Sequence, residues 1–148
     1  MSKPKALSRA VTHHVRDTCL CLHLQRAARV VARRFDEALR PLALTNGQFS
    51  LLMSLNRPEP PSIGSVSSLL AMDRTTLTAN LKPLERRGLV KVTVDPADKR
   101  GRRLALTQAG HALLHTAVPV WKRTHAAVEA LMTAPNPDRL RSALRALS

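Results

Sequence analysis

Apolar positions recur at helical spacing near both ends of the chain. Between residues 17 and 40 they follow one another at steps of three and four, which predicts a long helix with one apolar stripe. That stripe consists of Leu20, Leu24, Ala27, Val31, Phe35 and Ala38. Pro41 ends the helix at Arg40, because the residue before a proline avoids helical geometry. A second stripe from 107 to 131, interrupted by Pro119, and a third after Asn136-Pro137 predict C-terminal helices.

The middle of the chain contains three shorter helical stretches, each preceded by a residue suited to cap it. Thr45 and Gln48 have the spacing of a capping box, and Ser62 and Asp73 stand before the next two helices. In the third helix, Pro83 is expected to produce a kink and Gly88 to supply the stop. Its buried face is predicted to consist of Leu77, Leu81 and Leu84.

After Gly88 the periodicity changes from that of a helix to that of a strand. Residues 89–94 alternate, residues 103–106 form the return strand, and a loop rich in cations joins them. The sequence therefore predicts a mainly α fold with a small β-wing, namely a winged helix-turn-helix core flanked by dimerisation helices. The expected division is a flexible arm or frayed helix start at 1–16, an N-terminal dimerisation helix at 17–40, a DNA-binding domain at 41–106 and C-terminal dimerisation helices at 107–148.

Composition and charge indicate which kind of partner this fold binds. The 148 residues are 44% hydrophobic, enough for one compact core, and carry a net charge of +14. Residues 82–103 hold eight cations against three acids, so a basic block coincides with the third helix and the wing. This arrangement predicts double-stranded DNA as the partner.

Several classes of function are disfavoured by what the sequence lacks. No apolar run approaches the roughly 18 residues of a membrane span, and cations interrupt the N-terminus where a signal peptide would be apolar. We therefore expect a cytoplasmic protein without a membrane partner. A glycine-rich phosphate loop, paired carboxylates and a nucleophile motif are also absent from the sequence, so we expect neither an enzyme nor a cofactor.

The candidate DNA contacts lie on the third helix and on the wing. Small, polar and basic side chains allow close approach to the major groove, whereas wing arginines suit the minor groove. The helix contributes Arg74, Thr75, Thr76, Thr78, Lys82 and Arg86. The wing contributes Asp98, Lys99, Arg100, Arg102 and Arg103.

Taken together, four segments resemble the MarR family of transcription regulators. They are Leu44-Thr-Asn-Gly-Gln-Phe49, Asp73-Arg-Thr-Thr-Leu77, Leu84-Glu-Arg-Arg-Gly-Leu-Val90, and Asp95-Pro-Ala-Asp-Lys-Arg100 leading to Leu106-Thr-Gln-Ala-Gly110. The resemblance implies a homodimer on a palindromic operator, usually a repressor released by a small molecule or an oxidant. It further implies that Arg100 reaches the DNA and that Asp98 helps to orient it.

The trigger of such a regulator stays open between a small-molecule effector and thiol oxidation. An aromatic or phenolic effector would pair with basic side chains, for which the candidates are His13, His14, Arg16, Arg26 and Arg29. Thiol oxidation would act at Cys21 with Cys19 as a neighbour, although the chain has no tyrosine to support a thiolate in the way the peroxide-sensing branch of the family does. His111 and His115 have a spacing that suits a metal, but two ligands do not make a site, and we expect none.

A second class of function competes with an operator-specific regulator. A sequence-tolerant architectural protein would also use a charge of +14 to coat DNA. The two hypotheses differ in specificity, because a regulator prefers its site over random duplex by about 10³ or more.

Overall fold

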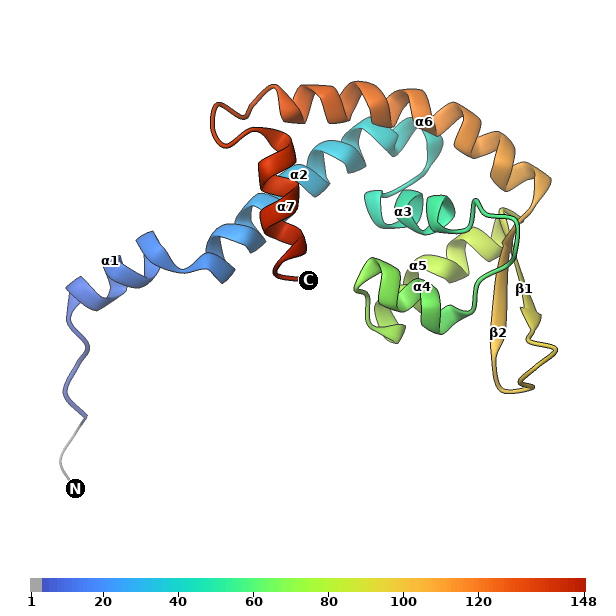
Figure 1. Cartoon of the computed structure of the whole chain (residues 1–148), viewed down its shortest axis with the longest axis horizontal. Helices are drawn as coiled ribbons and strands as arrows, with labels where there is room; N and C mark the ends of the chain where they lie inside the picture. The colour runs from blue at the N-terminus through green and yellow to red at the C-terminus, as the bar shows by residue number, and fades with distance from the viewer. Residues whose placement is uncertain (1–3) are drawn as a thin grey trace.

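The computed structural model describes residues 4–148 as a chain of helices with one hairpin (Figure 1). The N-terminal part comprises α1 (Arg9–Thr18), α2 (Leu20–Leu39) and the short 3-10 helix η1 (Arg40–Leu42). The central part comprises α3 (Asn46–Ser54), α4 (Ile63–Leu70), α5 (Arg74–Arg86), β1 (Val90–Val94) and β2 (Arg102–Leu106). Two helices, α6 (Gln108–Glu129) and α7 (Pro137–Arg145), complete the fold.

This architecture confirms the predicted mainly α fold with a small wing. β1 and β2 are antiparallel, with Val90 opposite Leu106 and Val94 opposite Arg102. The hairpin extends from the end of α5, while α6 lies along α2 at the other side of the core (Figure 1). None of the helices in residues 4–148 is long and apolar enough to cross a membrane.

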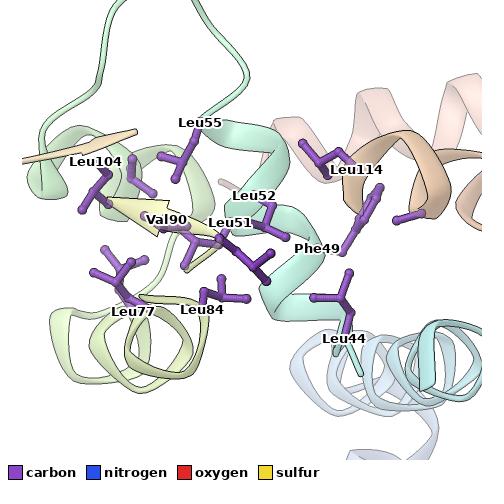
Figure 2. Packing of buried hydrophobic residues seen from close by; sticks show 14 of the residues in the cluster. Leu44, Phe49, Leu51, Leu52, Leu55, Leu77, Leu84, Val90, Leu104 and Leu114 are labelled. Carbon is purple, nitrogen blue, oxygen red and sulfur yellow. The ribbon is translucent and has the colours of Figure 1, made fainter. Parts of the chain in front are cut away.

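The hydrophobic core lies where α3 meets the other central elements. Leu51 and Leu52 are fully buried, as are Leu77 and Leu84 of α5 and Leu104 of β2. Figure 2 shows these side chains converging around α3, with Phe49 and Leu114 extending the cluster toward α6. The core therefore fixes α5 and the hairpin against one scaffold.

The caps that the sequence predicts are formed. Thr45 and Gln48 make a reciprocal capping box, with the Gln48 N–H donating to Thr45 Oγ1 at 3.2 Å and the Thr45 N–H donating to Gln48 Oε1 at 3.0 Å. The side chains of Ser62 and Asn136 cap α4 and α7 by accepting from the N–H groups of Ser65 and Arg139, without the reciprocal bond. These local hydrogen bonds set where the helices begin.

Three expectations about the helices are wrong. Residues 9–18 form α1 and are not an arm, and α2 begins only at Leu20 because Cys19 between them is extended, with φ −66° and ψ 108°. The third error is at Pro119, where α6 continues without interruption because its packing against α2 outweighs one lost backbone hydrogen bond. Residues 1–3 of the expected arm lie outside the described residues.

Candidate nucleic-acid interface

The outward face of α5 is positioned by its cap and its buried leucines. The Asp73 carboxylate accepts from the Thr76 N–H at 2.7 Å and from the Thr76 hydroxyl at 3.1 Å, and these hydrogen bonds hold the pKa of Asp73 below its ordinary value. The backbone and side chain of Thr76 are therefore both part of the N-terminal cap of α5. The remaining predicted contacts of this helix are exposed, namely Arg74, Thr75, Thr78, Lys82 and Arg86.

The C-terminal end of α5 is held by Arg87, whose contacts the sequence did not indicate, and by the stop expected at Gly88. The guanidinium of Arg87 donates to the carbonyl of Ala43 at 2.6 Å and to that of Leu42 at 3.1 Å. Gly88 takes φ +70°, which lets the Leu89 N–H reach the Leu84 carbonyl at 3.0 Å and close the helix. α5 also continues through Pro83 without a break. The outward face of α5 is therefore fixed at both ends of the helix.

The wing loop between β1 and β2 is organised by two aspartates. Asp98 accepts from the backbone N–H of Arg100 at 3.0 Å, and its own carbonyl accepts from the Gly101 N–H at 2.8 Å. Asp98 thus fixes the backbone of the tip, while the Arg100 guanidinium stays exposed and pairs with no acid of the described chain. This arrangement fits the orienting role that the resemblance implies for Asp98.

Arg102 and Arg103 are strand residues: β2 begins at Arg102, one position earlier than expected, and Arg103 is the strand residue that follows. Arg103 turns back toward the core: its Nε donates to Asp95 Oδ2 at 2.9 Å and its Nη1 to the Pro60 carbonyl at 3.2 Å. Arg102 donates to the carbonyls of Lys99 and Gly101. Arg103 therefore braces the wing and has its guanidinium engaged, while Lys99 and Arg102 remain exposed.

The start of α5 and the wing tip share one cleft of about 350 Å³. Its walls also include the first residues of α4. Among the predicted contacts it brings together Arg74, Thr78, Asp98, Arg100 and Arg102. Three arginines with an ordered loop and a helix N-terminus form a surface suited to phosphate oxygens.

Asp95 gives the wing a measurable dependence on pH. The Ala97 N–H and then Arg103 donate to its buried carboxylate, and they hold the pKa of Asp95 below its ordinary value. A carboxyl whose pKa falls on folding stabilises the native state above its unfolded pKa of about 3.9, and this contribution disappears as pH falls through the folded pKa. We expect Asp95→Asn to be less stable than the wild type at pH 7, and the gap to narrow as the pH falls below about 3.9 and through the lowered pKa of the folded state.

Thermal unfolding of both chains across this pH range measures the gap. Glu59→Gln is the matched control, because Glu59 is exposed and belongs to the proline-rich segment beside the wing. A difference between wild type and Asp95→Asn that stayed constant down to pH 3 would contradict a role for the charge of Asp95.

The predicted ligand-binding residues do not converge. His13, His14 and Arg16 lie on α1, and Arg26 and Arg29 lie on α2, all of them exposed. The Arg16 guanidinium pairs with Asp17 at 2.6 Å, which lowers the pKa of that carboxyl, and Arg29 donates to Gln25 at 3.2 Å. A ligand site at these five positions therefore stays a prediction.

A pocket that the sequence analysis missed lies between α3 and α6. It has a volume of about 360 Å³ and an apolar floor that includes Leu114. Met53 of α3 and Asn56, which follows that helix, line one side, and His111 and His115 of α6 line the other. In the sequence, only their metal-like spacing distinguishes the two histidines. In the described part of the chain, no group of three or more potential metal ligands is present.

Both cysteines are free thiols close to the joint between α1 and α2. Cys19 caps α2, with its Sγ accepting from the Leu22 N–H at 3.5 Å. Cys21 is exposed, and its Sγ accepts from the Gln25 side-chain amide at 3.3 Å. The Gln25 side-chain amide is therefore placed to donate a hydrogen bond to a Cys21 thiolate, although the chain has no tyrosine to do so.

Comparison with known proteins identifies the family. Residues 44–101 match the model of the MarR family. The chain is also similar to the transcriptional regulator MosR of M. tuberculosis in complex with DNA: 37% of residues are identical, 87% of this chain and 92% of that chain are covered, and the TM-score is 0.78. The chain belongs to the MarR family.

Two further proteins extend the MarR comparison. The transcriptional repressor CouR, bound to a 23-mer DNA duplex, is 29% identical with a TM-score of 0.78 and coverage of 97% of this chain and 99% of that chain. The organic hydroperoxide resistance transcriptional regulator of Bacillus subtilis is 29% identical over 68% of this chain and 69% of that protein. The chain spans 50 to 62% of the length of three other curated regulators that it matches. These similar proteins are named as regulators, in agreement with the expectation that the chain is not an enzyme.

Proposed function

We propose that this MarR-family chain binds a palindromic operator in double-stranded DNA as a homodimer and represses transcription. The observation that carries the proposal is the cleft shared by the α5 start and the wing tip, where Arg74, Arg100 and Arg102 meet. In a winged helix-turn-helix this places one helix toward the major groove and the wing toward the flanking backbone. The DNA-bound states of MosR and CouR support the same partner. Genomic DNA as partner makes the cytoplasm the expected compartment.

The direct test is fluorescence anisotropy of labelled duplexes at about 0.15 M salt. The promoter region upstream of the gene encoding this chain is compared with a scrambled duplex of equal length. We expect a preference of about 10³ or more for the promoter. Near-equal affinity, with the same steep dependence on salt, would instead favour an architectural protein that coats DNA through its charge.

The outward face of α5 should set the sequence preference. We expect Thr75→Ala and Lys82→Ala to reduce the ratio of operator to scrambled affinity, by about 1 to 3 kcal/mol for a side chain that contacts a base edge. Lys122→Ala is the matched control, because this lysine is exposed on α6 and does not belong to the outward face of α5. The anisotropy assay gives all three ratios. If the α5 variants behave like Lys122→Ala, α5 does not read the sequence.

We propose further that a small aromatic or phenolic ligand releases the DNA by binding in the pocket between α3 and α6. Apolar floors with a few convergent polar groups are typical of sites for such molecules. Here the polar groups are the two histidines and Asn56. A ligand in this pocket touches both the DNA-binding core, through α3, and the long α6. Loss of operator anisotropy on addition of benzoate or phenol, reduced in His115→Leu, tests the assignment.

Oxidation of Cys21, with Cys19 beside it, is the alternative trigger. The similarity to an organic hydroperoxide resistance regulator and the exposure of Cys21 favour it. In the same assay, organic hydroperoxide should then release the wild type from the operator and leave Cys21→Ser bound. Release of both proteins by peroxide would exclude Cys21.

A further inference from the structure

The junction between α2 and α3 contains a strained residue. Ala43, which ends η1, has φ 51° and ψ 41°, the left-handed conformation that glycine adopts freely and alanine only at a steric cost. Its N–H donates to the Arg40 carbonyl at 2.9 Å, and this hydrogen bond closes η1 before the chain turns into α3. A conformation of this kind persists only where the surrounding structure holds it. Other contacts must therefore keep Ala43 in place.

Those contacts come from the C-terminal end of α5. Two nitrogens of the Arg87 guanidinium donate to consecutive carbonyls, Nη1 to that of Ala43 at 2.6 Å and Nη2 to that of Leu42 at 3.1 Å. The last carbonyls of a helix lack partners within it, and a cation beside them is favourable. A guanidinium supplies both the charge and two donors in one plane. Arg87 therefore fits the end of η1 in charge and in geometry.

This contact connects α5 to α2. Arg87 is the C-cap residue of α5, and its N–H donates to the Pro83 carbonyl at 3.1 Å, so its backbone is fixed to that helix. On the other side, the junction is tied to α2, because Asp36 Oδ1 accepts from the Asn46 N–H at 2.6 Å. A displacement of α2 relative to the core would therefore act on α5 through Arg87.

We propose that Arg87 is a positioning residue for DNA binding. Its guanidinium holds the strained junction and thereby sets where the end of α5 lies relative to α2. Arg86, a predicted DNA contact, is the neighbouring residue, so a shift of this helix end displaces a side chain expected at the DNA. The inference rests on the proposed operator binding and names a residue on which that binding depends.

Replacing Arg87 by lysine separates geometry from charge. Lysine keeps the positive charge but lacks the planar fork that reaches two carbonyls at once. We expect Arg87→Lys to weaken operator binding by about tenfold in the anisotropy assay, a coupling typical of residues in one hydrogen-bond network. The slope of log affinity against log salt should stay that of the wild type, because no cation is lost.

Arg57→Lys is the matched control for this substitution. The guanidinium of Arg57 also donates to a carbonyl at a helix end, that of Ser54 at 3.1 Å, but this carbonyl is only three residues away. Circular dichroism at the assay temperature checks that both full-length variants are folded, so that lost affinity does not reflect unfolded protein. Equal operator affinity of Arg87→Lys and Arg57→Lys would overturn the proposal.

A second substitution tests whether the effect passes through the junction. Glycine at position 43 adopts the left-handed conformation without the cost that alanine has, so the junction then needs less support from Arg87. We expect Arg87→Lys/Ala43→Gly to regain about threefold or more of the operator affinity that Arg87→Lys loses. A direct contact between Arg87 and a phosphate would not be regained in this way. Equal affinity of the single and double variants would overturn the role of the junction.

The proposed function and the role of Arg87 can fail separately. A wild type that binds the promoter duplex no better than the scrambled duplex would overturn operator binding and the role of Arg87 together. A wild type that prefers the promoter, with an Arg87→Lys variant that matches Arg57→Lys, would overturn the role of Arg87 alone.

Discussion

Gly110→Ala is expected to reduce the free energy of unfolding by about 3 kcal/mol or more. A Cβ at Gly110 would lie 2.2 Å from the carbonyl oxygen of Leu89, where the start of α6 crosses the end of the α5–β1 connection. That oxygen cannot retreat easily, since it accepts from the Thr107 N–H at 3.1 Å, and the Leu89 N–H is itself bonded to Leu84. The methyl group must therefore displace α6 from the DNA-binding core.

Urea unfolding measures this loss, and Gly64→Ala is the matched control. Gly64 lies in α4, and a Cβ there would meet nothing closer than Ser62 Oγ at 4.0 Å. Alanine in place of glycine within a helix should be neutral or stabilising by about 0.5 to 1 kcal/mol. Equal stability of the two variants would mean that α6 and Leu89 are not in close contact.

Arg100→Ala is expected to weaken operator binding by about 1 to 3 kcal/mol, which is roughly five- to 150-fold, while the dimer remains intact. The Asp98 carboxylate fixes the Arg100 backbone by accepting from its N–H, and the guanidinium is exposed. Loss of one phosphate contact should also lower the slope of log affinity against log salt by about 0.9 per site.

The control for Arg100 is Arg139→Ala, which removes the same charge from an exposed position on α7. Anisotropy titrations at several salt concentrations give both affinity and slope for the two variants. If Arg139→Ala changes them as much as Arg100→Ala, the effect arises from net charge, and the wing has no specific part in binding.

The elements that could be predicted from the sequence are those decided by neighbours along the chain. Thr45, Ser62 and Asp73 cap their helices through hydrogen bonds to residues three positions later, so their types and spacing are sufficient. The periodicity of Leu77, Leu81 and Leu84 likewise fixes which side of α5 is buried and, by exclusion, which side faces a partner.

The features that could not be predicted depend on distant parts of the chain. Arg103 was expected to project from the wing, yet its guanidinium bonds to Pro60, 43 residues away. Arg87 similarly reaches carbonyls 44 and 45 residues away, and the pocket between α3 and α6 exists only after both helices have packed. Local patterns show which charged residues lie on a helix or strand. They do not show which of these residues form hydrogen bonds to distant parts of the chain.

The only tryptophan of the chain lies at an informative place. Trp121 of α6 stacks on Phe49 of α3, with ring centroids 6.4 Å apart, and on His125, 4.6 Å apart. Because the chain has one tryptophan and no tyrosine, its intrinsic fluorescence comes chiefly from this indole. Any movement of α6 relative to α3 changes the stacking that governs that emission. The protein therefore contains its own optical reporter of the junction between its DNA-binding core and its terminal helices, and it needs no label.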